Sequence, residues 1–200
     1  MKKKIKEAVN VLRNGGVVLF PTETAYGLAA DATNTNAIKR VFKLKGRRNE
    51  YPPPLIAATE DMARRTVEIT PMLNQFVKKY WPGALSVKVW PKKGSKLSSW
   101  TKRPDGSVAI RVSSHEIASA LSKGLKKPII ATSANRHKMP SCYSVKACVR
   151  QFKGQKLAPD VMIDIGAIPK RKTSTIIGEE NGKIVVYRKG PIRIPKKYVA

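Results

Sequence analysis

Hydrophobic positions along the chain recur at two spacings, which predict helices alternating with short buried strands. Ile5, Val9 and Leu12 follow a helical repeat that stops at Gly15, and residues 17–20 form a continuous apolar run of strand length. The same patterns, with helix-start residues, predict helices over residues 37–46, 60–68, 71–80, 117–123 and 145–152. They predict strands over residues 55–58, 84–90, 107–112 and 128–131, with shorter strands near Val161, Ser174 and Ile184.

The interleaving of these elements predicts an α/β protein with a sheet of mixed strand direction. Two hundred residues with 42% hydrophobic content are enough to bury one sizeable core. No Pro/Gly/Ser-rich stretch is long enough to separate two cores, and no internal repeat is present. We therefore expect residues 1–200 to form a single domain.

The chain shows no pattern typical of export or membrane insertion. Its apolar runs are a few residues long, against about 18 for a membrane-spanning helix. The basic start at residues 1–4 lacks the apolar segment of a signal peptide. Cys142 and Cys148 have neither metal-site spacing nor that of a secreted disulfide framework, and His115 and His137 have no zinc-ligand partners. We expect reduced thiols, structural histidines, a cytoplasmic location and no membrane partner.

Positive charge dominates the composition, with 40 Lys and Arg against 13 Asp and Glu and a formal net charge of +27. Such an excess favours phosphate-rich partners. The cations are spread along the chain rather than gathered in a tail, in clusters at residues 2–4, 43–48, 92–96, 126–127, 170–172 and 196–197. Two interpretations stay open at this point, a solvated cationic surface and a specific nucleic-acid footprint.

Three segments far apart in sequence place hydroxyl, amide or cationic groups where a predicted strand or helix ends. They are residues 21–28 (PTETAYGL), 45–47 (KGR) and 132–135 (TSAN). Each alone has an ordinary explanation, because Thr and Gly form turns, cations complement a helix C-terminus, and Ser and Asn cap helices. Together they fit a cleft for a small polyanion, outside the strand ends where α/β sheets bind ligands.

The predicted strand at residues 107–112 leaves two interpretations open. Ser107, Ala109 and Arg111 share one face, which is either a solvent-facing surface or a ligand floor with one anchoring charge. Glu23 is similarly ambiguous, since it is either a base or, as we favour, a carboxylate that braces its loop.

The order of these features resembles the YrdC-like family of threonylcarbamoyl-AMP synthases. The ordered set is PTETxYGL after a strand, KxR at a helix end, WPG at residues 81–83, a strand ending in Arg111, and TSAN. The resemblance runs from about Ile5 to Arg188, and its specificity lies in the order, since KxR and SxN are common strings. It implies a twisted, open, mostly mixed sheet flanked by helices around a large basic concave cavity. The length matches the family's short, single-domain members.

The family's reaction is implied as well. Its members combine L-threonine, bicarbonate and ATP into threonylcarbamoyl-adenylate and pyrophosphate, for tRNA modification by a downstream transferase complex. By motif match, threonine would be bound by Thr24, Arg111, Ser174 and the backbone near Ala131. The nucleotide would be bound by Arg47, Ser107, Ser133, Asn135, Ser141 and Arg188. Lys45 would lie between the two, and Lys45 and Arg47 are expected to act in catalysis from an exposed helix end. No protein-built metal site is expected, so any Mg²⁺ would be carried by ATP.

The sequence departs from the family pattern at three places. Two extra residues precede Leu55, Ala58 stands where many relatives have His, and His137-Lys138 replaces the usual Ser-Gly. The reaction class is therefore better supported than the amino-acid specificity. Two alternatives are a module that binds double-stranded RNA or tRNA without catalysis, and a domain that forms a carbamoyl-adenylate from carbamoyl phosphate.

Overall fold

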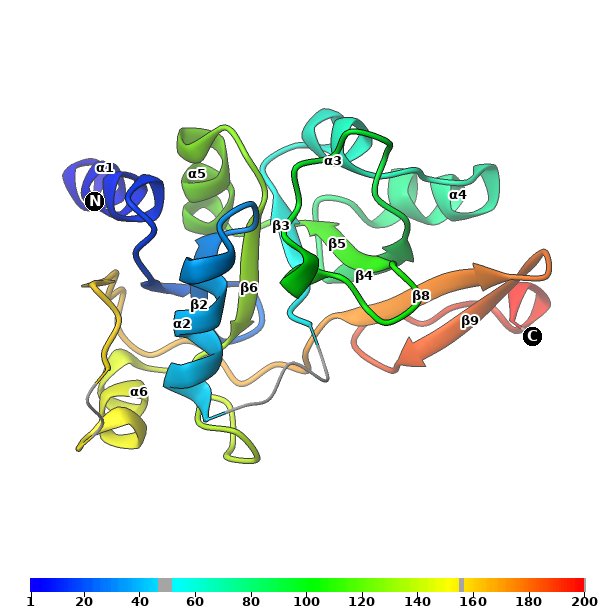
Figure 1. The fold of residues 1–200 in the computed structure, drawn as a ribbon. Coiled ribbons are helices and arrows are strands. Elements are labelled where there is room, and N and C mark those ends of the chain that lie inside the picture. The colour runs from blue at the N-terminus through cyan, green and yellow to red at the C-terminus, as the bar shows by residue number, and fades with distance from the viewer. Residues whose placement is uncertain (47–51, 155–156, 200) are drawn as a thin grey trace.

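The computed structural model describes residues 1–46, 52–154 and 157–199, which form a nine-stranded mixed sheet flanked by helices (Figure 1). The strand order is β7-β1-β2-β6-β3-β5-β4-β8-β9. The strands are β1 Val18–Pro21, β2 Tyr26–Asp31, β3 Leu55–Ala57, β4 Leu85–Val89, β5 Val108–Val112, β6 Ile129–Ser133, β7 Val161–Met162, β8 Thr175–Glu180 and β9 Lys183–Arg188. The helices are α1 Lys2–Arg13, α2 Thr35–Lys45, α3 Glu60–Thr66, α4 Pro71–Tyr80, α5 Glu116–Leu125 and α6 Val145–Phe152. The predicted α/β class with a mixed sheet is confirmed.

Alternating side chains of the strands supply two hydrophobic clusters on opposite faces of the sheet. In β1, Leu19 belongs to one cluster, whereas Val18 and Phe20 belong to the other. Helices α1 and α5 cover the face of Phe20, and they pack against each other. Helices α2, α3, α4 and α6 contribute to the opposite cluster. The sheet is therefore covered by helices on both sides, a point that the alternation of helices and strands had left open.

Side chains that begin the helices explain why several element boundaries were predictable. Asn34 accepts a hydrogen bond from the Ala37 backbone N–H, and Thr70, directly before Pro71, caps α4 in the same way. Helix α2 ends at Gly46, whose positive φ of 60° favours glycine.

The hairpin of β1 and β2 differs from the prediction, which placed the polar segment 21–28 after the first strand and gave no strand within it. Only residues 22–25 form the turn, because Pro21 pairs with Tyr26 in an antiparallel ladder. The strand was missed because Gly27, Ala29 and Ala30 have weak strand propensity. It lies between β1 and β6 with every residue buried.

Strand β6 is also longer than predicted. It extends through Thr132 and Ser133, which pair with Leu28 and Gly27 of β2. The sequence had indicated that these two polar residues follow the strand, but they belong to the sheet.

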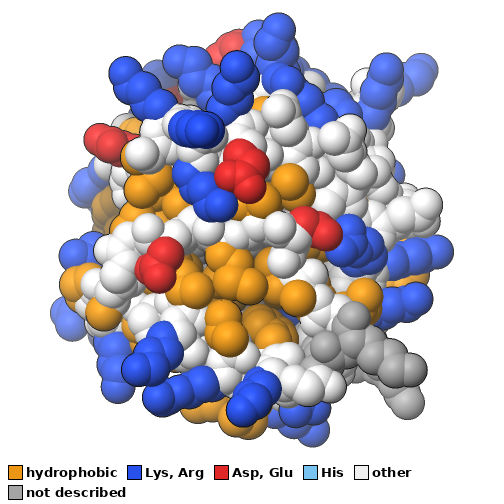
Figure 2. Space-filling model, turned by 90° about the vertical axis from the view of Figure 1, so that its left-hand side faces the viewer, with side chains coloured by type: hydrophobic (Ala, Val, Ile, Leu, Met, Phe, Trp, Pro, Cys, Tyr) orange, Lys and Arg blue, Asp and Glu red, His pale blue; other side chains and the backbone are white. Residues whose placement is uncertain are grey.

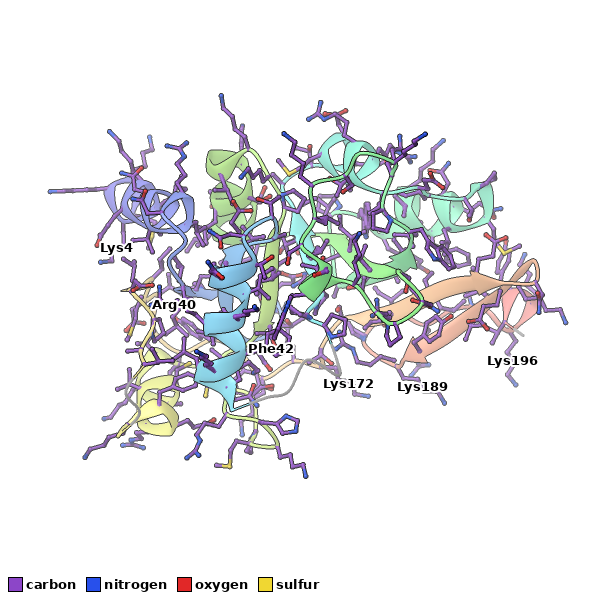
Figure 3. All side chains as sticks on the ribbon, viewed as in Figure 1. Lys4, Arg40, Phe42, Lys172, Lys189 and Lys196 are labelled. Atoms are coloured by element: carbon purple, nitrogen blue, oxygen red, sulfur yellow. The ribbon has the colours of Figure 1, made fainter. Side chains whose placement is uncertain are left out.

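Basic side chains cover much of the molecular surface. Figure 2 shows Lys and Arg around the rim of one face, with hydrophobic side chains gathered toward its middle. In Figure 3, Lys172, Lys189 and Lys196 project along the same lower edge of the molecule. In the described part of the chain, no helix combines the length and the apolar character that a bilayer span requires.

Candidate functional site

A cavity of about 290 Å³ opens on the sheet face that α1 and α5 partly cover. Its floor includes Gly27 of β2 and Ala131 and Ser133 of β6, which alternate with residues of the opposite core. Small side chains at these positions leave room above the strands. Of the predicted site residues, the structure brings six together on the cavity wall: Thr24, Arg111, Ala131, Ser133, Ser174 and Arg188.

The turn between β1 and β2 places Thr24 on the cavity wall. The Thr22 hydroxyl donates to the Ala25 carbonyl over 2.7 Å and accepts from the Thr24 backbone N–H over 3.2 Å. Thr22 is buried, so the turn is held by its own side chain rather than by solvent. The polar turn that the sequence indicated is thus a fixed part of the site.

Arg111 enters the cavity from β5 as a buried cation with a carboxylate partner. Its guanidinium pairs with Glu23, and the Ser113 hydroxyl donates to the other Glu23 oxygen over 2.5 Å. Burial, and then the charge of Arg188, lower the pKa of Arg111, whereas the Glu23 carboxylate supports its charged form. The solvent-facing alternative for this strand face is wrong, because Ser107, Ala109 and Arg111 are all buried.

Arg188 closes the opposite side of the cavity from the last strand. Its Nε donates to the Ser174 carbonyl and its Nη2 to the Ser174 hydroxyl, both over 2.8 Å. The Ser174 hydroxyl also lies 3.1 Å from the hydroxyl of Ser86 in β4. Burial, and then the charge of Arg103, lower the pKa of Arg188. Ser174 and Arg188 are thus held as one unit.

Lys45 does not lie on an exposed helix end, and that expectation is wrong. Its residue is only 4% exposed, and its ammonium donates to the carbonyls of Ser133 and Asn135, over 2.8 Å to the latter. The Lys45 carbonyl accepts from the His137 backbone N–H. Lys45 thus fastens the TSAN segment to α2, and it is not among the residues of the cavity wall.

The other predicted nucleotide residues have different surroundings. Ser107 is fully buried, and its hydroxyl donates to Asp105 over 2.6 Å. The Asn135 amide donates to the carbonyls of Arg136 and Met139, the former over 2.9 Å. Ser107, Asn135 and Ser141 are not among the residues of the cavity wall. Arg47 lies outside the described residues.

Sequence reasoning missed Arg103, which reaches the cavity wall from the turn before β5. Residues 103–106 (RPDG) are typical of an exposed turn, so the sequence offered no indication that the Arg103 guanidinium is half-buried on a cavity wall. Burial lowers the pKa of Arg103, although the charges of Asp105 and Tyr187 oppose the shift. Among the described residues, the cavity wall thus carries the guanidinium groups of Arg103, Arg111 and Arg188.

Comparison with known proteins agrees with this fold and with the motif order. A family model that carries the names Sua5, YciO and YrdC, and the description "Telomere recombination", matches residues 10–190. A threonylcarbamoyl-AMP synthase of Pyrococcus abyssi is 36% identical over 188 residues, which are 94% of this chain and 54% of the relative. One of Saccharophagus degradans is 31% identical over 175 residues, which are 87% of this chain and 88% of the relative.

A solved structure adds a comparison in three dimensions. The crystal structure of P. abyssi Sua5 complexed with L-threonine matches with a TM-score of 0.85 at 32% identity, covering 95% of this chain and 55% of that one. The chain thus spans about half the length of the Pyrococcus relative. Because the family model covers nearly the whole chain and the P. abyssi Sua5 structure shares its fold, the chain belongs to the Sua5/YciO/YrdC family, as its motif order predicted.

Proposed function

We propose that this protein is a threonylcarbamoyl-AMP synthase, which forms threonylcarbamoyl-adenylate and pyrophosphate from L-threonine, bicarbonate and ATP. The observation that carries the proposal is the convergence of Thr24, Arg111, Ser133, Ser174 and Arg188 on one cavity, in a chain whose relatives are named for this activity. These five residues come from strands or turns up to 164 positions apart, and all five belong to the larger set that the motif match selected. We further propose that residues 1–200 act as one domain.

Threonine would occupy the end of the cavity near Arg111. A guanidinium fork suits a carboxylate, and Thr24 offers a hydroxyl on the same wall. Because Arg111 is already paired with Glu23, the threonine carboxylate would share the cation while the threonine amine lies near the Glu23 carboxylate. Ser174 and the backbone at Ala131 would complete the amino-acid site.

The nucleotide would occupy the side of the cavity that Ser133 and Arg188 border. We keep Arg47, Ser107, Asn135 and Ser141 as predicted nucleotide residues. Lys45 would act chiefly by holding the loop of Ser133 and Asn135 in place, because its ammonium donates to both of their carbonyls. Any Mg²⁺ would be carried by the nucleotide phosphates.

The chemistry needs positive charge more than a nucleophilic side chain. The threonine nitrogen would bond to the carbon of bicarbonate with loss of water, which gives a carbamate. A carbamate oxygen would then bond to the α-phosphorus while the bond from that phosphorus to the bridging oxygen breaks, and pyrophosphate leaves. Fixed guanidinium groups offset the repulsion between carboxylate, carbamate and phosphates, and positioning of the two reactants lowers the barrier further.

The experiment that tests the proposal is pyrophosphate release by the purified chain with ATP and bicarbonate, with and without L-threonine. Release that depends on threonine is the expected result. Release with carbamoyl phosphate in place of threonine and bicarbonate would point to the carbamoyl-adenylate alternative. RNA binding with a steep salt dependence and no pyrophosphate release would support a binding module instead. The named relatives favour the synthase.

A further inference from the structure

Arg103 is held in place by a short turn that leaves its guanidinium group available. The Arg103 backbone N–H donates to the Ser107 carbonyl over 2.8 Å, and the Gly106 N–H donates to the Arg103 carbonyl over 2.8 Å. Gly106 has a φ of 80°, which favours glycine. The backbone of this turn is therefore fixed before any ligand binds.

The guanidinium of Arg103 itself is not satisfied within the protein. Its Nη1 atom is buried, and it has no hydrogen-bond partner among the described residues. The nearby carboxylate of Asp105 is already engaged, because it accepts from Ser107 and pairs with Lys88 over 2.9 Å. A buried donor on a cation is costly to leave unpaired, which is the situation that a bound anion relieves.

The three guanidinium groups of the cavity are not equivalent. Arg111 has the Glu23 carboxylate, and Arg188 has the carbonyl and hydroxyl of Ser174. Arg103 lacks such a partner for its buried nitrogen within the described ranges. The backbone of Arg103 lies in the turn before β5, bonded to Ser107, whereas Arg111 lies near the other end of β5, four residues after Ser107. Four residues of extended strand span about 13 Å, so the two side chains leave the backbone at different ends of β5.

We propose that Arg103 binds the terminal phosphates of the nucleotide, the diphosphate that leaves as pyrophosphate, at the end of the cavity away from the threonine site. The inference rests on the proposed function for the identity of the nucleotide. Three features carry it: a rigid turn, a buried guanidinium nitrogen with no partner among the described residues, and a point of attachment at the opposite end of β5 from Arg111. A planar guanidinium is suited to two oxygens of a diphosphate at once.

Binding measurements without turnover test this role directly. We would titrate the purified full chain with inorganic pyrophosphate, AMP and L-threonine by calorimetry, at about 0.15 M salt to suppress non-specific attraction. The variants are Arg103→Gln and Arg103→Lys, and the matched control is Lys102→Gln, which removes a neighbouring charge that is not on the cavity wall. Circular dichroism verifies folding. If Arg103→Gln is unstable, the pyrophosphate affinity of Arg103→Lys is the test.

Loss of an ionic hydrogen bond predicts that Arg103→Gln weakens pyrophosphate binding about 10- to 100-fold while AMP and threonine change less than about twofold. Arg103→Lys should lose less pyrophosphate affinity, because lysine keeps the positive charge but lacks the planar guanidinium. Lys102→Gln should bind pyrophosphate as tightly as the unmodified chain does. Unchanged pyrophosphate affinity in Arg103→Gln, or no measurable pyrophosphate binding by the unmodified chain, overturns the proposal. An equal loss of affinity for AMP also overturns it, because that result would place Arg103 at the α-phosphate. So does a loss of affinity for threonine alone.

The same measurements separate this inference from the proposed function. If the unmodified chain shows no threonine-dependent release from ATP but binds pyrophosphate through Arg103, the synthase assignment fails and the diphosphate site stands. If turnover is normal and the Arg103 variants bind pyrophosphate as the unmodified chain does, only the role of Arg103 fails.

Discussion

The two ends of the cavity use buried cations in different ways. At one end, Arg111 is paired with Glu23, which is itself held by Ser113. At the other, Arg103 keeps a buried nitrogen without a partner among the described residues. The ion pair of a paired cation supports the fold before any ligand binds. An unpaired cation forms its stabilising interaction only when an anion binds. Substitution of Arg111 should therefore lower the stability of the fold, whereas substitution of Arg103 should lower the affinity for the anion.

The largest effect is expected from Arg111→Gln, which breaks the buried ion pair and leaves the Glu23 carboxylate with the Ser113 hydroxyl but without its cation. We expect a loss of about 3–5 kcal/mol in the free energy of unfolding, together with loss of threonine binding. Urea denaturation measures the first and calorimetry the second. The double variant Glu23→Gln/Arg111→Gln should be more stable than Arg111→Gln. If the single variant is as stable as the unmodified chain, the first half of the comparison is wrong.

Lys45→Met tests whether a buried cation that is bonded to neutral carbonyl oxygens contributes to stability, as the ion-paired Arg111 is expected to do. The change leaves the Ser133 and Asn135 carbonyls without the ammonium, so we expect about 1–3 kcal/mol of destabilisation by urea denaturation. It should also lower pyrophosphate release, because the loop of Ser133 is no longer held. Lys43→Met, on the exposed side of the same helical turn, is the control. Full stability with lost activity would instead favour direct contact with substrate.

Arg103→Gln sharpens the comparison from the other end. Removal of a half-buried guanidinium, whose Nη1 has no partner among the described residues and which lies near Arg188, should change the free energy of unfolding by less than about 1 kcal/mol, with stabilisation as the expected sign. Added pyrophosphate should stabilise the unmodified chain more than this variant, since only a ligand that binds the folded state shifts unfolding. A loss above about 2 kcal/mol would show that Arg103 is a structural residue like Arg111.

The smallest effect concerns Asp105, which orders the turn that bears Arg103. Burial opposes ionisation, but hydrogen bonds from Ser107 and Lys88 outweigh it and lower the pKa of Asp105 to about 2. Because the folded-state pKa is depressed, this contribution is present above about pH 4 and is lost as the pH falls through about 2. The side chain is 43% exposed, so we expect less than about 1 kcal/mol.

Urea denaturation of Asp105→Asn and the unmodified chain at several pH values measures this contribution. The stability gap between the two should narrow as the solution is acidified below pH 4. A gap that stays constant down to about pH 2 would show that ionisation of Asp105 does not support the turn.

Local chemistry explains which elements could be predicted from the sequence. Helix α4 was predictable because Thr70 and Pro71 start it and apolar residues repeat along it. Strand β2 was not, because its small residues are fully buried by neighbours distant in sequence. Strand propensity measures side-chain packing, which Gly27 and Ala29 provide only in the assembled sheet.

The candidate site shows the same limit at the level of single residues. Thr24, Arg111 and Ser133 were found through motif order, and the structure places them on one wall. The burial of Lys45 was not predicted, because a lysine in the last turn of a helix is ordinarily explained by the helix dipole. Arg103 had no motif at all. Its place on the cavity wall depends on how the turn before β5 folds in three dimensions, which single-sequence patterns do not record.

The position of Arg188 in the last strand has a consequence for biosynthesis. Strand β8 joins the sheet beside β4, about ninety residues earlier in the chain, and β9 then pairs with β8. A ribosome that has released only the first 170 residues has therefore produced the floor of the cavity without Ser174 or Arg188. Until the hairpin of β8 and β9 has been synthesised, the edge of β4 that pairs with β8 has no partner strand. The cavity wall is thus complete only after Arg188 has been synthesised, and a chain terminated before Ser174 would carry most of the sheet and an incomplete pocket.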